Sequence, residues 1–390
     1  MSGIEPVRGA FFSPPEAPPG ETAAPPYDII TPEGHRRLLE RNPYNVVRFT
    51  LGDEPGKEGD FQGADAVLSR LVAEGIIKVD PQPAFYVYEV RFPGAARREP
   101  FLGLVGAVSV RAKVLPHERT MGAVKEGRLR ALEGTRANLG LVLLACRDGG
   151  RLTEVLQRGR ERLRAEAEVR AGEVHAVWNL ECELWEEAKA VLDPLPLIIA
   201  DGHHRFQTAQ YYASLHPEDP AAQRVLVVVA GMGSRSGLQI LPTHRVVRFP
   251  SVNEAAAWAA DLVAAFDMCA PEEADLTVYS PRMPEGVALR VSVPPDCGSL
   301  IAYLHELWLD RLREPVRVRA AHDLPEEPGQ LCVRESVVVL RVRAVRPEEL
   351  ERTVQRGEVL PPKSTFFYPK VYSGLIMRLL DFDLDRAQEA

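Results

Sequence analysis

The chain has 390 residues, of which 45% are hydrophobic and 26% are charged, and its formal net charge at pH 7 is −8. This composition is ordinary for a soluble globular protein, and the length predicts two or three compact lobes. The negative balance argues against a protein that holds nucleic acid through bulk positive charge.

The cysteines and the chain start indicate a compartment. Five cysteines are far apart and include no Cys-x-x-Cys pair, which is typical of reduced thiols in a cytosolic protein. The first twenty residues lack the apolar core of a signal peptide, and no window approaches the ~18 apolar residues of a membrane span. We therefore expect a cytoplasmic protein with no membrane or nucleic-acid partner, while the oligomeric state stays open.

The first third of the chain predicts mainly strands after an irregular start. Residues 1–26 are rich in proline and predict an irregular arm. Residues 84–92 alternate and carry aromatic and β-branched side chains, which predicts a strand. Residues 101–115 predict a strand pair or one long bent strand, and residues 139–146 predict a buried strand.

Two helical patterns interrupt these strands. The first follows "PHERT" (116–120) and continues to about Asn138. The second covers residues 151–171, which are charged on most faces and predict an exposed helix.

The middle of the chain predicts alternating strands and helices. Residues 196–200 and 224–232 are apolar runs that predict buried strands, and residues 206–215 between them have helical spacing. Two short strands, 238–241 and 245–249, are predicted around Pro242-Thr243-His244.

A separate C-terminal lobe is predicted to begin near residue 251. Ser251-x-x-Glu254 is a capping-box pattern that opens a helix. Further helices are predicted near 299–313 and 346–357, with a strand at 336–344. Together these elements predict an α/β (mixed α+β) protein, with a core over residues 27–250 and a C-terminal α+β lobe over 251–390.

The junction Asp201-Gly202-His203-His204-Arg205 is the most informative stretch, because it stands between a buried strand and a helix. A helix N-terminus attracts anions, and a glycine lets a ligand approach the backbone. Arginine grips phosphate through two donors, histidine binds phosphate or metal, and aspartate can hold Mg²⁺. The alternative is a helix cap, loop histidines and a surface arginine.

Two standard nucleotide signatures do not account for this junction. The chain contains no Gly-x-x-x-x-Gly-Lys-[Ser/Thr], which excludes a P-loop. The segment "AGMGSRSG" (230–237) displaces the third glycine of a dinucleotide fingerprint, and the residues that follow read as a strand.

Six motifs in chain order resemble those of the domain of unknown function 1015 family, and the resemblance spans nearly the whole chain. They are "APPYDII" (24–30), "NPYNVVRF" (42–49), "LPHERTM" (115–121), "IIADGHHRFQTA" (198–209), "ILPTHRVV" (240–247) and "LPPKSTFFYPK" (360–370).

The junction also resembles the phosphate-binding turn of the ParB/sulfiredoxin superfamily, which implies a ParB/sulfiredoxin-like core. The resemblance implies that Gly202, His203, His204 and Arg205 contact nucleotide phosphates. Thr208, in the same helix, joins this predicted phosphate-binding set. Asp201 is similar to the aspartate that opens the motif of the free-serine kinase branch.

The branches of the superfamily differ in the residues they need. Sulfiredoxin chemistry needs a cysteine where this chain has His203, and partition proteins carry a DNA-binding domain that is not recognisable here. The kinase branch needs a carboxylate that takes a proton from a substrate hydroxyl. By analogy of role, Glu118 is the predicted base, with His117 beside it; the alternative is a helix-start acid next to a loop histidine.

The C-terminal motif "PPKSTFFYPK" combines cations and hydroxyls on an aromatic stretch. We predict that Lys363, Ser364 and Thr365 help to bind phosphate, and Lys370 is a further cation of the same motif. The alternative is a packed C-terminal turn.

The sequence therefore predicts a nucleotide-dependent small-molecule phosphotransferase that resembles free L-serine kinase. It would use ATP or ADP, with Mg²⁺ near Asp201. Two alternatives stay open. One is a non-catalytic nucleotide-binding switch. The other is a metal-dependent hydrolase built from His117, Glu118, Asp201, His203, His204 and His244.

Overall fold

The chain folds into two compact units with a mixed α/β architecture, which confirms the predicted class. The computed structural model describes residues 3–57, 59–94, 99–119, 126–170, 172–233, 235–294 and 297–383. The first unit comprises Met1–Leu115, Gly122–Gln239 and Pro369–Ala390, and the second comprises Pro116–Met121 and Ile240–Tyr368. The middle segment of the first unit therefore ends at residue 239, whereas the sequence predicted a boundary at residue 250. The first unit resumes at residue 369.

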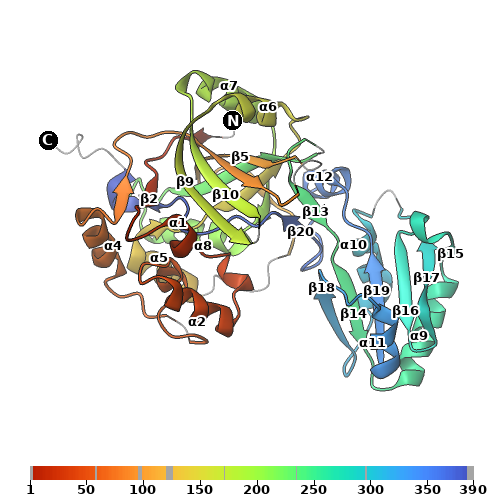
Figure 1. Cartoon of the computed structure of the whole chain (residues 1–390). Helices are drawn as coiled ribbons and strands as arrows, with labels where there is room; N and C mark the ends of the chain where they lie inside the picture. Colours follow the sequence, from red (N-terminus) through yellow and green to blue (C-terminus); the bar gives the residue numbers. More distant parts are fainter. Residues whose placement is uncertain are drawn as a thin grey trace. The chain divides into compact units, whose positions relative to one another are not determined.

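A large mixed sheet forms the centre of the first unit (Figure 1). Its strand order is β6-β11-β8-β12-β5-β4-β10-β9, and β1 pairs with β5. The strands are β1 (Ile4–Glu5), β4 (Tyr86–Arg91), β5 (Phe101–Ser109), β6 (Val114–Pro116), β8 (Val142–Cys146), β9 (Arg160–Arg170), β10 (Glu173–Leu180), β11 (Leu197–Asp201) and β12 (Arg224–Gly231).

The central strands are apolar because both of their faces are covered. β8 and β12 run parallel, while β11 pairs with β8 and β5 pairs with β12 in antiparallel fashion. Every residue of β8 is buried. The buried strands predicted over 139–146, 196–200 and 224–232 are therefore confirmed as β8, β11 and β12.

Three helices pack on one face of this sheet: α6 (Arg151–Arg158), α7 (Trp185–Leu192) and α8 (His203–Leu215). Leu156, Leu192 and Phe206 from these helices join a core cluster with buried residues of β5, β8 and β12. The helix predicted over 206–215 is confirmed, and it begins three residues earlier, so the Asp-Gly-His-His-Arg junction is a direct strand-to-helix turn.

A second core cluster forms around the N-terminal residues and a group of short helices. The helices with residues in this cluster are α2 (Pro32–Arg41), α3 (Val47–Thr50), α4 (Ala64–Ala73) and α13 (Leu380–Asp383). The first unit also contains α1 (Pro19–Thr22), α5 (Glu126–Thr135) and 3-10 turns at Tyr27–Ile29 and Cys182–Leu184. Two small sheets complete this part: β2 (Ala10–Phe12) with β3 (Ile77–Val79), and β7 (Ala137–Asn138) with β21 (Arg378–Leu379). Figure 1 shows α2, α4 and α5 at the opposite end of the unit from α6 and α7.

The C-terminal segment of the first unit holds the N-terminal residues in place. The stretch predicted as an irregular arm contributes β1, β2 and α1, and Ala10 and Ala24 are fully buried. The Ala10 amide donates to the Met377 carbonyl over 2.8 Å, and Ala24 pairs with Ser373. The two chain regions therefore order each other.

The helix predicted over residues 151–171 is correct only in its first part. α6 ends at Arg158, and residues 160–170 form β9, which pairs antiparallel with β10. Ala165 and Ala167 are buried at a spacing of two, as a strand requires. Strand pairing thus overrides the helix propensity of the Arg, Glu, Ala and Leu residues in this segment. For the other helical pattern, residues 120–125 lie outside the described residues, and the described helix α5 begins at Glu126.

The second unit contains an antiparallel sheet with the order β15-β17-β16-β19-β14-β18. Its strands are β14 (His244–Arg248), β15 (Asp267–Met268), β16 (Leu276–Ser280), β17 (Met283–Arg290), β18 (Arg317–Ala321) and β19 (Val337–Val342). A separate pair joins β13 (Gln239–Leu241) to β20 (Phe366–Tyr368).

The second unit also contains the helices α9 (Val252–Ala264), α10 (Leu300–Leu304), α11 (Pro328–Arg334) and α12 (Pro347–Gln355), with a π-helical turn at His305–Leu309 and a 3-10 turn at Pro271–Glu273. Of these, α9 packs on β16 and β19, and α11 packs on β16, β17 and β19. The Ser251 side chain accepts a hydrogen bond from the Glu254 amide, so the predicted cap of α9 is confirmed. The predicted helices near 299–313 and 346–357 and the strand at 336–344 are also present.

Within the described ranges, no helix has both the length and the apolar character needed to cross a membrane.

His244 is held as a neutral imidazole inside the second unit. Its Nδ1 accepts a hydrogen bond from the Val342 amide over 3.1 Å, and the residue is 7% exposed. Burial, and then the nearby charge of Arg341, lowers the pKa of His244 to about 4 from an ordinary value of 6.5. Protonation at Nδ1 would remove the acceptor of the Val342 amide.

We expect His244 to make the second unit sensitive to acid. Because the folded-state pKa lies below the unfolded one, this stabilisation is complete above pH 6.5 and is lost as the pH falls toward 4. The lowered pKa corresponds to a decrease in the free energy of unfolding of more than about 2 kcal/mol between pH 7 and pH 4.5. In His244→Asn, the side-chain oxygen can still accept a hydrogen bond from the Val342 amide. This variant should therefore lose less stability than the wild type between pH 7 and pH 4.5. Urea unfolding followed by tryptophan fluorescence measures both proteins, and equal acid sensitivity would contradict the expectation.

Candidate functional site

The candidate site begins at the turn between β11 and α8. Four residues of β11 are buried, and Asp201 at its end is partly exposed. Gly202 follows with φ +93°, a left-handed conformation that an L side chain rarely adopts, and α8 starts at the next residue. The glycine is therefore required to turn the chain directly from strand to helix.

Two glycines make room for the Arg205 side chain. A Cβ at Gly202 would lie 3.0 Å from Arg205 Nε. A Cβ at Gly140 would lie 2.5 Å from Ser373 Oγ and 3.2 Å from an Arg205 guanidinium nitrogen. The backbone thus approaches the guanidinium from two sides.

One carboxylate joins two cations at this turn. Asp201 Oδ1 pairs with Lys370 Nζ over 3.0 Å, and Asp201 Oδ2 pairs with an Arg205 nitrogen over 3.0 Å. Asp201 and Lys370 are 16% exposed and Arg205 is 18% exposed. Arg205 also donates to the Leu141 carbonyl. We call Asp201, Gly202, Arg205 and Lys370 the turn cluster.

The charges of the turn cluster keep Asp201 ionised. Burial alone raises the pKa of this carboxyl, but Lys370 and Arg205 outweigh that effect, so the pKa is lowered overall. With one negative and two positive side chains, the turn cluster carries a net charge of about +1.

The start of α8 adds to this positive potential. Gly202 provides no side-chain cap, and the first turn of α8 contains no acidic residue. A helix N-terminus carries roughly half a positive charge, which here has no local compensation from its own first turn. His203, His204 and Arg205 are the first three residues of α8, ahead of the predicted helix start at 206, and both histidines are partly buried.

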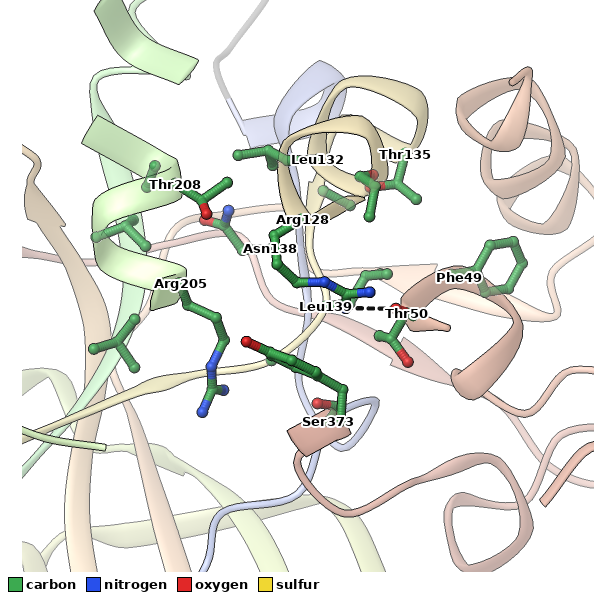
Figure 2. A pocket seen from close by; sticks show the side chains of 17 residues that line it. Phe49, Thr50, Arg128, Leu132, Thr135, Asn138, Leu139, Arg205, Thr208 and Ser373 are labelled. Carbon is green, nitrogen blue, oxygen red and sulfur yellow. Dashed lines mark hydrogen bonds between the residues drawn. The ribbon is translucent and has the colours of Figure 1, made fainter. Parts of the chain in front are cut away.

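Tyr27 and Arg128 lie close to the turn cluster. The Arg128 guanidinium is 4.3 Å from the centre of the Tyr27 ring and donates to the Thr50 carbonyl. Burial, followed by the charge of Asp28, raises the pKa of Tyr27, whereas Arg128 and Arg205 act in the opposite direction. Both residues border the same cavity as Arg205. Figure 2 shows Arg128 and Arg205 in this lining.

The turn cluster does not fit the predicted Mg²⁺ contact at Asp201. Each carboxylate oxygen already accepts a hydrogen bond from a cation, and Lys370 and Arg205 repel a divalent metal. In the described part of the chain, no group of three or more histidine, cysteine, aspartate or glutamate residues has a metal-binding arrangement. The turn cluster is instead suited to an anion.

The predicted base and the C-terminal motif form a cluster within the second unit. His117 Nε2 is 2.7 Å from Thr365 Oγ1, and the Ser364 amide donates to Glu118 Oε2 over 3.3 Å. His117 and Ser364 are buried, and Lys363 adopts φ +56°. We call His117, Glu118, Lys363, Ser364 and Thr365 the second-unit cluster.

A buried arginine accompanies the second-unit cluster. Arg245 is 1% exposed and donates to His305 Nε2 and to the Thr243, His244 and Pro362 carbonyls. In the described part of the chain it makes no ion pair. Burial lowers its pKa to about 10, although the charges of Glu118 and Asp310 act in the opposite direction.

The structure divides the predicted site residues between the two units. Asp201, Gly202, His203, His204, Arg205 and Thr208 lie together on the first unit, whereas the second-unit cluster holds His117, Glu118, Lys363, Ser364 and Thr365. The sequence assigned Lys363 to phosphate, but Lys370 is the cation of that motif that reaches Asp201. No spacing rule in the sequence separates these two lysines.

A comparison with models of protein families identifies the family of this chain. The model of a family described as "Protein of unknown function (DUF1015)" matches residues 4–325. The chain belongs to this family. A comparison with curated proteins found no match.

Several solved structures are similar in part. A C-terminally truncated SbnI from Staphylococcus aureus is 13% identical, with 72% of this chain and 90% of that chain covered and a TM-score of 0.41. A free serine kinase variant in complex with ADP is 14% identical, with 75% of this chain and 99% of that chain covered and a TM-score of 0.37. A conserved hypothetical protein from Pyrococcus furiosus is 14% identical, with 71% of this chain and 97% of that chain covered and a TM-score of 0.34.

We expect Asp201 to compete with an anion for the cations of the turn cluster. Asp201→Asn removes the counter-charge of Lys370 and Arg205, which should lower stability by about 1–3 kcal/mol in the absence of anions. The same change should strengthen anion binding. Thermal unfolding in sodium sulfate, against sodium chloride at equal ionic strength, should show a larger sulfate-dependent rise in Tm for the variant than for the wild type.

Glu33→Gln is the matched control for Asp201→Asn. Glu33 pairs with Arg36 and Arg37 on an exposed helix surface, so its loss also leaves two arginines without a counter-charge. Glu33 lies in the first turn of α2, but the Thr31 side chain caps that helix and both arginines are more than half exposed, so sulfate should act on this control as on the wild type. An equal sulfate response in all three proteins would contradict a specific anion site.

Proposed function

We propose that this protein is a nucleotide-dependent small-molecule phosphotransferase whose turn cluster binds phosphate groups of the nucleotide. The observation that carries the proposal is the pair of cations, Arg205 and Lys370, held on one carboxylate beside the uncapped start of α8. Such an arrangement supplies two charged donors and a helix N-terminus to one anion.

The electrostatics favour a phosphate over a neutral ligand. Arg205 offers a planar fork of donors, and Lys370 offers a compact charge from a distant part of the chain. Both side chains are largely buried, so their charges are screened less than those of surface residues. Asp201 orients both cations and leaves a net positive charge at the turn cluster.

The proposed reaction transfers the terminal phosphoryl group of the nucleotide to a hydroxyl. A bond forms between the hydroxyl oxygen and the terminal phosphorus, and the bond from that phosphorus to the bridging oxygen breaks. The leaving nucleotide keeps the electron pair, and the hydroxyl proton passes to a base. Arg205 and Lys370 stabilise the charge on the phosphate oxygens during transfer.

The proposed reaction uses Glu118 as its base and assigns no role to a metal. Glu118 remains the proposed base, and its carboxylate is held by the Ser364 amide in the second-unit cluster. No step depends on Mg²⁺, because Asp201 does not fit as its ligand.

Nucleotide titration tests the phosphate site directly. Lys370→Met and Arg205→Lys should each weaken ADP binding about tenfold or more, because a charge-assisted hydrogen bond is lost in each variant. Arg162→Ala alters an exposed arginine of β9 and should leave ADP affinity unchanged. Isothermal titration calorimetry, with and without Mg²⁺, measures the affinities. If the wild type does not bind ADP or ATP, the proposed function is wrong.

Turnover separates the enzyme from a non-catalytic nucleotide switch. Glu118→Gln keeps an oxygen that can accept from the Ser364 amide but cannot take a proton at neutral pH. We expect this variant to bind ADP as the wild type does and to lose turnover about 10²-fold or more, measured as hydroxyl-dependent loss of ATP. Unchanged turnover in the variant would remove Glu118 from the reaction, and a wild type that binds nucleotide without turnover would be a switch.

A further inference from the structure

A small cavity of about 100 Å³ adjoins the turn cluster within the first unit. It lies between α5 and α8, and Figure 2 shows Arg205 and Thr208 of α8 on one side and Arg128 and Leu132 of α5 on another.

Thr208 brings an unused hydroxyl to this cavity. The residue is 3% exposed, and its Oγ1 has no hydrogen-bond partner among the residues that the structure describes. Threonine in a helix commonly satisfies its hydroxyl at a preceding carbonyl, but Thr208 does not. A buried hydroxyl without a partner costs free energy, and a bound ligand would recover that cost.

Asn138 adds a second polar group to the cavity. Its Oδ1 accepts from the Leu226 amide and from Arg378, which fixes the orientation of the side-chain amide. Across the described part of the chain, no partner exists for its Nδ2 donor. Thr208 and Asn138 therefore provide hydrogen-bonding capacity that the protein itself does not use.

The size of the cavity limits the ligand. One water molecule needs a cavity of at least roughly 10–15 Å³, so a cavity of about 100 Å³ has room for several water-sized groups. Pockets for larger ligands commonly measure about 300–1,000 Å³. The cavity is therefore smaller than the usual pocket of a larger ligand such as a nucleoside, and it is suited to a second, smaller molecule.

The charge of the lining limits the ligand further. Arg128 and Arg205 both line the cavity, and no carboxylate is among its described lining residues. The remaining walls are mainly apolar, including Leu132, Leu139 and Val142. A ligand that satisfies these groups has an anionic end, a short apolar stem and a further polar group.

We infer that this cavity binds the phosphoryl acceptor, and that the acceptor is a small hydroxy acid. This inference rests on the proposed function, because Arg205 belongs both to the turn cluster and to the cavity lining. Shared contact with Arg205 brings the acceptor hydroxyl close to the phosphates of the donor. Thr208 and Asn138 then decide which small acids bind.

Thr208→Val tests the inference, with Thr153→Val as its control. Thr153 also has a buried hydroxyl without a partner in the described chain, and it lies on α6, away from the cavity. Both variants should be at least as thermally stable as the wild type, because each replaces an unsatisfied hydroxyl with a methyl group. The probes are glycerate, L-serine and L-threonine, with adenosine as the oversized comparison, and saturation-transfer NMR measures their binding.

We expect at least one small acid to bind the wild type, and Thr208→Val to weaken that binding about tenfold. Thr153→Val should leave it unchanged and should keep the ADP affinity of the wild type. The inference is overturned if no small acid binds, if adenosine competes for the same site, or if both valine variants weaken binding equally. Binding of a small acid without any binding of ADP would instead refute the phosphotransferase and leave the small-acid cavity intact.

Discussion

The ion pairs of Asp201 are the constraint on which the candidate site depends. A single carboxylate fixes Arg205 from the following helix turn and Lys370 from a segment 169 positions later in the chain. Arg205 can reach it only because Gly202 adopts a left-handed backbone and Gly140 has no side chain. The same arginine borders the cavity of Thr208, so one guanidinium organises both proposed ligand sites.

The first unit is held together by residues far apart in the sequence. The Tyr372 amide donates to the Tyr88 hydroxyl, the Gly374 amide donates to the Leu139 carbonyl, and Met377 pairs with Ala10. These contacts place Lys370 at the turn as a consequence of backbone pairing along the whole segment. A flexible lysine on a surface loop would lose much more conformational entropy on pairing with Asp201.

The sequence predicted what local pattern determines and missed what distant pairing determines. The apolar runs at 139–146, 196–200 and 224–232 are strands because burial on both faces requires apolar residues throughout. Residues 160–170 read as a helix because their composition favours one, yet pairing with β10 makes them a strand. For the same reason, no rule of spacing showed that Lys370 pairs with Asp201.

The return of the chain to the first unit at Pro369 has a consequence for synthesis on the ribosome. Residues 240–368 are translated before the segment that carries Lys370 and β21. While they emerge, the nascent first unit lacks the partners of Ala10 and Ala24 and the lysine that pairs with Asp201. Domains commonly fold in order from the N-terminus as they are made. In this protein, the first unit can complete its packing only after the whole second unit has been translated.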